Sequence, residues 1–195
     1  AAWRDFGRVL AALHDADAGD RYGFHMDNHL GSTPQPNGWM DDWVDFNAKR
    51  RLGHQLHLGT SSGAIVPREA DRIRRLIDGL DKVLPRHPHP SLLHGDLWSG
   101  NALPTVDEKG EACIGLIDPA VSIGDGLADI AMMQLFGGFS AACFEAYFNH
   151  RTTDAGTLID QRIAVYRLYH VLNHVNLFGR GYAGQARSLL DRLGV

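Results

Sequence analysis

The sequence predicts an α+β fold that is mainly helical, with a small β-hairpin sheet near the middle of the chain. Apolar residues recur at helical spacing along most of the chain, whereas short apolar runs bounded by turn residues occur between residues 91 and 117. The chain has 195 residues, of which 44% are hydrophobic and 22% are charged. A chain of this size and composition can bury a sizeable core without disulfides, and its main state is folded rather than disordered.

The part of the chain before this central region is predicted to be helical with one long loop. In order, we expect a helix at 3–13, an ordered loop rich in Gly, Pro, Asn and Asp at 20–38, a helix at 41–58, and a break at 59–63. Pro67 suits the first turn of the next helix, because its missing N–H has no helical partner there. Helical spacing then continues until Pro85 ends the helix.

The central region contains the predicted strands, and helices follow it. Strands are expected at 91–94, 103–106 and 113–117, with the last two joined by a turn at 107–110. Helices are expected at about 126–136, 140–150, 156–178 and 183–193. Glycines at 137–138 and 179–184 separate these helices.

Composition excludes several functional classes. The net charge of −4 lacks the basic character of a nucleic-acid-binding domain, and no apolar run approaches the roughly 20 residues of a membrane helix. Cys113 and Cys143 form no metal or redox motif, so we interpret them as reduced thiols in a cytoplasmic protein, although two cysteines could pair. The first residues already show helical spacing, and they do not form a signal peptide. Both observations suggest that this chain is part of a longer protein.

A polar constellation around the predicted strands indicates phosphoryl transfer. Asp96 and Asn101 lie five residues apart in a loop that leaves a strand, and Asp118 follows the strand after the hairpin. Phosphoryl transfer needs a carboxylate to orient an acceptor hydroxyl and take its proton, and oxygen ligands for Mg²⁺. Asp96 fits the first role, and Asn101 with Asp118 fits the second. The alternative is that these residues only cap turns. The preceding His94 and the flanking strands favour the kinase interpretation.

The segment that contains these residues resembles the catalytic loop of the fructosamine kinases, also called ketosamine-3-kinases. Residues 94–101 have the sequence HGDLWSGN, in which the WSG part is more specific than the wider kinase pattern. The resemblance continues through residues 28–37 (NHLGSTPQPN) and 136–139 (FGGF), and it spans nearly the whole chain. This family is related to aminoglycoside and choline kinases and has a protein-kinase-like fold.

The resemblance implies ATP-dependent phosphorylation of the 3-hydroxyl of a fructosamine, free or attached to a protein, by direct in-line transfer. It implies Asp96 as the base and Asn101 with Asp118 as Mg²⁺ ligands, while Asp129 supports the catalytic loop. We also expect His94 to be a buried structural contact. Trp98 could stack on the sugar or be a core aromatic. The resemblance places three further residues at the edge of the acceptor site: Trp39, Asp41 and Asp42.

Two departures from the family pattern bear on this interpretation. Residues 124–127 (GDGL) lack the basic and acidic pair usual before Asp129, which affects substrate preference. The strand lysine, helix glutamate and phosphate-covering loop of a kinase are also absent before residue 14. We therefore expect residues 1–195 to be the C-terminal, catalytic and acceptor-binding lobe, with the N-terminal nucleotide lobe outside this chain.

Other functions are supported by the sequence less strongly than a fructosamine kinase. An aminoglycoside- or choline-type kinase remains an alternative, as does a non-catalytic binding domain. The literal GTSSG at 59–63 follows a predicted helix, which disfavours a hydrolase that uses Ser61. The literal GRGYAG at 179–184 is expected to be a turn between helices. His170 and His174 have metal-ligand spacing but no third ligand, so we expect packed histidines.

Overall fold

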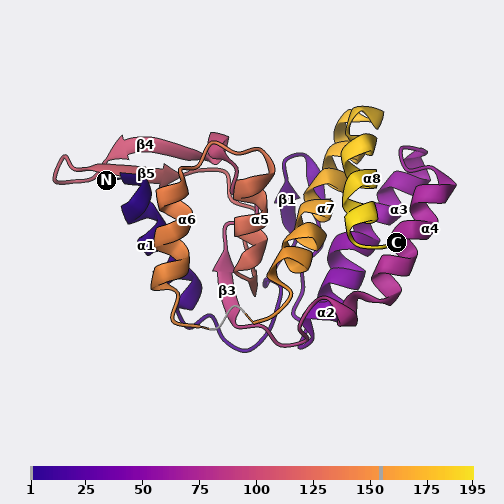
Figure 1. Ribbon diagram of the computed structural model, residues 1–195, viewed down its shortest axis with the longest axis horizontal. Coiled ribbons are helices and arrows are strands. Elements are labelled where there is room, and N and C mark those ends of the chain that lie inside the picture. The colour runs from indigo at the N-terminus through magenta and orange to yellow at the C-terminus, as the bar shows by residue number, and fades with distance from the viewer. Residues whose placement is uncertain (1, 154–155) are drawn as a thin grey trace.

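A computed structural model describes residues 2–153 and 156–195. The chain opens with α1 (Ala2–Asp15), which packs along α6 (Ala141–His150) at one end of the molecule (Figure 1). A Cβ at Gly7 would overlap the carbonyl oxygen of Cys143, so this glycine allows the two helices to approach closely. The predicted first helix is confirmed, except that Val9 is exposed rather than on its buried face.

Within the residues that the structure describes, six short strands form three antiparallel pairs. β4 (Ala102–Val106) and β5 (Ala112–Leu116) form the predicted hairpin, and β3 (Pro90–Leu93) pairs with β6 (Ser122–Asp125). The third pair, β1 (Asn28–Leu30) with β2 (Thr33–Gln35), lies in the segment predicted to be a loop. The strands β1, β2 and β6 were not predicted, because each has only three or four residues and too few apolar ones to give a recognisable alternation.

The segment predicted as one helix over 41–58 is divided into three. It contains α2 (Trp43–Phe46), a π-helical segment (Asn47–Leu52) and α3 (Gly53–Ser62). The predicted break at 59–63 is wrong for residues 59–62, which stay helical, and the missing side chain of Gly59 leaves room for Ile65. The helix ends at Gly63, whose φ of 74° is favourable for glycine. Next comes α4 (Pro67–Asp78), which begins at the predicted proline and is followed by a 3-10 turn (Leu80–Lys82).

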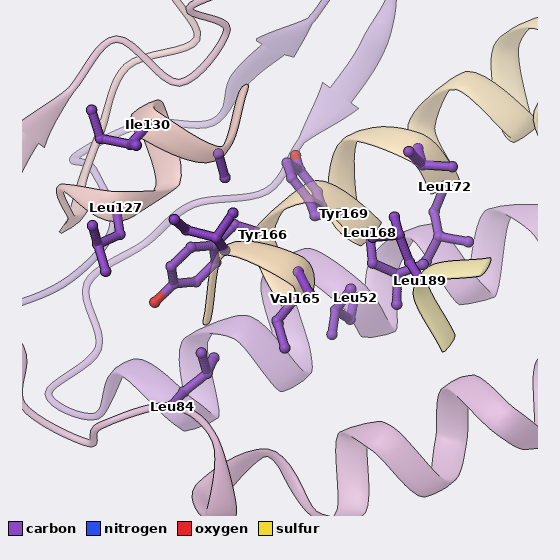
Figure 2. Close-up of a cluster of buried hydrophobic side chains, with 14 of the residues drawn as sticks. Leu52, Leu84, Leu127, Ile130, Val165, Tyr166, Leu168, Tyr169, Leu172 and Leu189 are labelled. Carbon is purple, nitrogen blue, oxygen red and sulfur yellow. The ribbon is translucent and has the colours of Figure 1, made fainter. Parts of the chain in front are cut away.

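The second half of the chain contains the predicted helices. They are α5 (Leu127–Leu135), α6, α7 (Ile159–Phe178) and α8 (Ala183–Arg192). The long helix α7 lies between α5 on one side and α3 and α8 on the other (Figure 1). Its side chains are buried on nearly every side. Figure 2 shows side chains of α7 packed with others from distant segments: Leu52, Leu84, Leu127, Ile130 and Leu189.

Helices and small antiparallel sheets therefore coexist, which confirms the α+β class. Cys113 and Cys143 are both free. Within residues 2–153 and 156–195, no helix has the length and apolar character needed to cross a membrane.

Candidate active site

The predicted catalytic loop is attached to a buried carboxylate. It begins where β3 ends, and the carboxylate of Asp129 on α5 lies directly behind it. One carboxylate oxygen accepts the backbone N–H of His94 at 2.8 Å, and the other accepts that of Gly95 at 2.9 Å. The Asp129 side chain is completely buried. This geometry fits the supporting role predicted for Asp129.

A histidine that the sequence analysis did not select completes the environment of Asp129. The Nε2 of His14 lies 3.3 Å from a carboxylate oxygen of Asp129, and its Nδ1 lies 2.8 Å from the hydroxyl of Tyr147. Burial raises the pKa of Asp129, but the hydrogen bond and charge of His14, the charge of His94 and the Gly95 N–H together lower it below its ordinary value. The carboxylate is therefore stabilised in its ionised form.

His94 joins the catalytic loop to the segment that contains Asp118. Its Nε2 lies 2.9 Å from the carbonyl oxygen of Ile117, and its own carbonyl oxygen accepts the Ala120 N–H at 2.8 Å. At Gly95, with a φ of 81°, a Cβ would overlap the Ala120 carbonyl oxygen. The buried His94 thus has the structural contact that we expected, and only glycine fits beside it.

Asp96 and Asn101 contact each other across the turn of the loop. The Asn101 Nδ2 donates to the main-chain oxygen of Asp96 at 2.9 Å and approaches its carboxylate at 3.4 Å. With its nitrogen used in this way, the amide presents its oxygen as the group able to coordinate a cation. Burial raises the pKa of Asp96, and the charges of His94 and His174 only partly oppose that rise.

Asp118 lies next to this pair on the neighbouring loop. The N–H of Ile117 donates to the carbonyl oxygen of Asn101 at 3.1 Å, so the backbone just before Asp118 runs beside Asn101. Asp118 is exposed and has a φ of 51°, an uncommon conformation for a residue other than glycine. Such backbone strain is concentrated at functional sites.

The residue types here fit a magnesium ion. Mg²⁺ prefers oxygen ligands, uses one or two protein side chains and takes further oxygens from phosphates and water. An exposed carboxylate and an amide oxygen on adjoining loops meet that requirement. Over the described residues, no group of three or more His, Cys, Asp or Glu side chains is arranged to bind a metal.

Trp98 lies beside the site and is not a core residue. Its side chain is 40% exposed, and its ring covers Gly100 so closely that a Cβ there would overlap the ring. The alternative of a core aromatic is therefore wrong. An exposed indole two residues from Asp96 has a free face on which a sugar can stack.

The two aspartates predicted at the edge of the acceptor site are engaged elsewhere, whereas the ring of Trp39 is exposed. Asp42 caps α2 by accepting the Asp45 N–H at 3.0 Å, and it pairs with Arg86 at 2.6 Å. Asp41 pairs with Arg21 at 2.8 Å, and the same arginine donates to the carbonyl oxygen of Trp39.

These contacts place the carboxylates away from Asp96. The N–H of Trp43, next to Asp42, donates to Arg86, which precedes the start of β3, whereas Asp96 follows its end. Figure 1 shows α2 at the opposite edge of the molecule from β4 and β5. The structure therefore does not bring Asp41 and Asp42 to Asp96.

An amide cluster that was given no role in the sequence analysis supports the Asp118 loop. The Asn28 Nδ2 donates to the carbonyl oxygen of Val121 at 2.8 Å, and the Gln35 Nε2 donates to that of Ala120 at 3.1 Å. Gln35 also accepts the hydroxyl of Tyr169 on α7 at 2.7 Å. The hairpin β1–β2 therefore positions the backbone that follows Asp118.

The competing motifs are accounted for by their positions. Ser61 lies in the last turn of α3, not in a strand-to-helix turn, so the hydrolase interpretation is wrong. The predicted turn between α7 and α8 is formed by residues 179–182, whereas residues 183–184 already belong to α8. His170 is buried, and the Nδ1 of His174 lies 2.8 Å from the carbonyl oxygen of His170, as expected for packed histidines.

Comparison with known proteins decides the family. The family model described as "Fructosamine kinase" matches residues 1–194. The chain belongs to the fructosamine kinase family. The predicted resemblance is thereby confirmed.

Individual members of the fructosamine kinase family align with most of this chain. A "probable ketoamine kinase" of Synechocystis is 44% identical over 194 residues, which are 98% of this chain and 62% of the relative. The chloroplastic protein-ribulosamine 3-kinase of Oryza sativa subsp. japonica is 42% identical over 95% of this chain and 52% of the relative. The chain thus spans about three fifths or less of the length of these two relatives.

Solved structures show the same fold. The crystal structure of a "putative fructosamine-3-kinase" from Thermobifida fusca is 30% identical, has a TM-score of 0.88, and is matched over 98% of this chain and 64% of that protein. A choline/ethanolamine kinase family protein from Mesorhizobium loti has a TM-score of 0.55 at 15% identity, over 98% of this chain and 61% of that protein, which indicates a related fold.

Another segment on which the resemblance to fructosamine kinases rested also contacts the catalytic loop. A Cβ at Gly138, where φ is 91°, would lie 2.5 Å from the Cβ of Ser99. The loop between α5 and α6 therefore packs directly on Ser99 of the catalytic loop. Both family-specific segments, 28–37 and 136–139, surround the residues predicted to perform the chemistry.

Proposed function

We propose that this chain is the catalytic and acceptor-binding lobe of an ATP-dependent kinase that phosphorylates the 3-hydroxyl of a ketosamine. The observation that carries the proposal is the pair of loops that bear Asp96, Asn101 and Asp118, joined by hydrogen bonds above the buried Asp129. Relatives named as ketoamine kinase and protein-ribulosamine 3-kinase support this acceptor class, whether free or protein-bound. The two free thiols are consistent with a cytoplasmic location.

In this proposal Asp96 is the general base. Its carboxylate accepts the proton of the acceptor hydroxyl as that oxygen attacks the γ-phosphorus of ATP, and the bond from phosphorus to the ADP oxygen breaks in line. No phosphoenzyme forms. Asn101 keeps the Asp96 backbone in place through its 2.9 Å hydrogen bond, while its amide oxygen and the Asp118 carboxylate provide the oxygen ligands. Bound Mg²⁺ would neutralise charge on the phosphates.

The hairpin β4–β5 carries exposed apolar side chains beside these ligands: Leu103, Val106, Leu116 and, directly after it, Ile117. Because Leu116 pairs with Ala102, Leu116 and Val106 lie on one face of the hairpin and Leu103 lies on the other. Exposed apolar side chains mark a surface that contacts another group. We assign this surface to the nucleotide and to an N-terminal lobe that supplies the phosphate-binding lysine and covering loop.

The isolated chain is expected to transfer phosphate negligibly. In kinases, the lysine and the covering loop that engage the nucleotide phosphates lie outside this lobe. We therefore expect ATP-dependent ketosamine phosphorylation from the full-length enzyme and at least about 10³-fold less from residues 1–195 alone. A coupled ADP-release assay with both proteins measures this. Comparable turnover by residues 1–195 would show that they contain a complete nucleotide site.

Asp118→Asn is expected to raise the Mg²⁺ concentration needed for half-maximal activity. The substitution retains an oxygen but removes the charge that binds the cation, and the expected increase is at least about tenfold. A Mg²⁺ titration of the full-length enzyme at saturating ATP measures it. Asp20→Asn, which neutralises another exposed aspartate, is the matched control. An unchanged Mg²⁺ requirement in Asp118→Asn would remove Asp118 from the metal site.

A further inference from the structure

An aromatic cluster lies at the end of α7, outside the residues that the mechanism uses. The ring of His174 is at its centre, with ring centroids 5.1 Å from Phe136, 5.5 Å from Phe178 and 5.0 Å from Tyr182. Phe178 and Tyr182 also contact each other at 6.1 Å. We refer to these four residues as the aromatic cluster.

The aromatic cluster is continuous with the candidate active site. Phe136 begins the loop whose Gly138 contacts Ser99 in the catalytic loop. The His174 side chain lies near enough to the carboxyl group of Asp96 to influence its pKa. The end of α7 also lies beside the turn of β1–β2, because a Cβ at Gly31 would be 3.8 Å from the side chain of Leu177 (Figure 1).

Two phenylalanines of the aromatic cluster are exposed to solvent. Phe178 is 65% exposed and Phe136 is 42% exposed. Single exposed apolar residues are common, but adjacent exposed aromatics beside a reactive carboxylate are typical of a ligand contact. Trp98 is the other exposed aromatic near Asp96, and its ring lies over Gly100 within the catalytic loop. The site thus has two separate aromatic surfaces.

A ketosamine has two parts that need such surfaces. One is the sugar, and the other is the amine with the side chain attached to it, which we call the arm. The 3-hydroxyl oxygen and the amine nitrogen are separated by three carbon atoms, so they are at most about 5 Å apart. With the hydroxyl at Asp96, the arm must therefore leave the site within a short distance of this carboxylate.

We propose that the aromatic cluster binds the arm of the ketosamine and sets the preference for long-arm acceptors, whereas Trp98 contacts the sugar. This inference rests on the proposed function. A protonated secondary amine is attracted to aromatic faces, and the methylene groups of a lysyl arm pack on the same rings. Phe136 is nearest the catalytic loop in the chain, and Phe178 extends the surface to the exposed end of α7. An arm that follows this surface leads outward, as a protein-bound acceptor requires.

The test compares two acceptors in the full-length enzyme. One is 1-deoxy-1-methylamino-fructose, which has almost no arm, and the other is Nε-fructosyl-lysine blocked at both termini. The measured quantity is kcat/KM for the long-arm acceptor divided by that for the short-arm acceptor. We expect Phe178→Ala to lower this ratio about tenfold and Phe178→Tyr to retain it. Phe148→Ala, which removes another exposed phenylalanine from α6, should leave the ratio unchanged.

Because Phe178 is largely exposed, Phe178→Ala should fold normally, and its melting temperature checks this. An unchanged ratio, or an equal loss with both acceptors, would overturn the inference while leaving the proposed function intact. A wild-type enzyme that phosphorylates neither acceptor would overturn the proposed function, and this inference with it.

Discussion

Asp96→Asn in the full-length enzyme is expected to lower kcat for ketosamine phosphorylation by about 10²–10⁴-fold, the usual contribution of a general base. An amide cannot accept the hydroxyl proton, but it has nearly the same size as the carboxyl group. The strongest contact of Asn101 is with the main-chain oxygen of residue 96, so the loop should keep its conformation. Steady-state assays with a ketosamine and ATP give kcat, and circular dichroism checks the fold.

The control for this substitution is Asp20→Asn, because it removes the same charge from an exposed position outside the site. It should turn over acceptor at the wild-type rate. If a well-folded Asp96→Asn enzyme also retained wild-type turnover, Asp96 would not be the base and the proposed mechanism would fail.

The pH profile provides an independent check on Asp96. Burial raises the pKa of this carboxyl group above its ordinary value of about 3.9. Only the ionised form accepts a proton, so activity should fall as the pH drops through this raised pKa. The acid limb of kcat/KM should therefore lie at a higher pH than that of an exposed aspartate. Ionisation of the buried group also opposes folding, so Asp96→Asn should unfold at a slightly higher temperature at neutral pH.

The sequence locates most of the helices because apolar residues recur at helical spacing over long segments, although α4 ends at Asp78 and not at Pro85. Helix α1, with apolar residues on one side, and helix α4, which begins at Pro67, were both located. The π-helical segment at 47–52 was not predicted, because its apolar spacing resembles that of the adjoining α-helices. β1 and β2 were missed because hydrogen bonds between amide side chains and a distant loop, rather than apolar alternation, fix this hairpin.

The core of the candidate site could be predicted because its residues are local in sequence. Asp96 and Asn101 share one loop, and Asp118 follows the next hairpin. The supporting residues His14 and Gln35 could not be found in this way. Each is far from the loop in sequence, and its partner is determined only by the tertiary fold.

The expectation for Asp42 shows how a local signal can be overlooked. An aspartate directly before a helix is a common N-cap, and Asp42 accepts the N–H three residues later in that way. Its pairing with Arg86 then connects the helix to the segment before β3. These two structural contacts account for a carboxylate that the resemblance had placed at the acceptor site.

Asp129→Ala is expected to be the most destabilising of the substitutions considered, by about 3–5 kcal/mol in the free energy of unfolding at neutral pH. The substitution leaves the backbone N–H groups of His94 and Gly95 buried without an acceptor, and each such group costs about 1–3 kcal/mol. It also removes the partner of the His14 Nε2. Chemical denaturation followed by tryptophan fluorescence measures the loss.

The control for this loss is Asp191→Ala, which removes an exposed carboxylate that pairs with Arg72 and should cost less than about 1 kcal/mol. Equal effects of the two substitutions would contradict the supporting role of Asp129.

The pH dependence of stability shows whether the ionised carboxylate of Asp129 stabilises the fold. Because the folded-state pKa of Asp129 is below its ordinary value, the stabilisation is complete above about pH 5 and declines as the pH falls toward the lowered pKa. The difference in stability between the wild type and Asp129→Ala should therefore narrow in acid, whereas a difference that stayed constant with pH would show that the ionised carboxylate is not the source of the stabilisation.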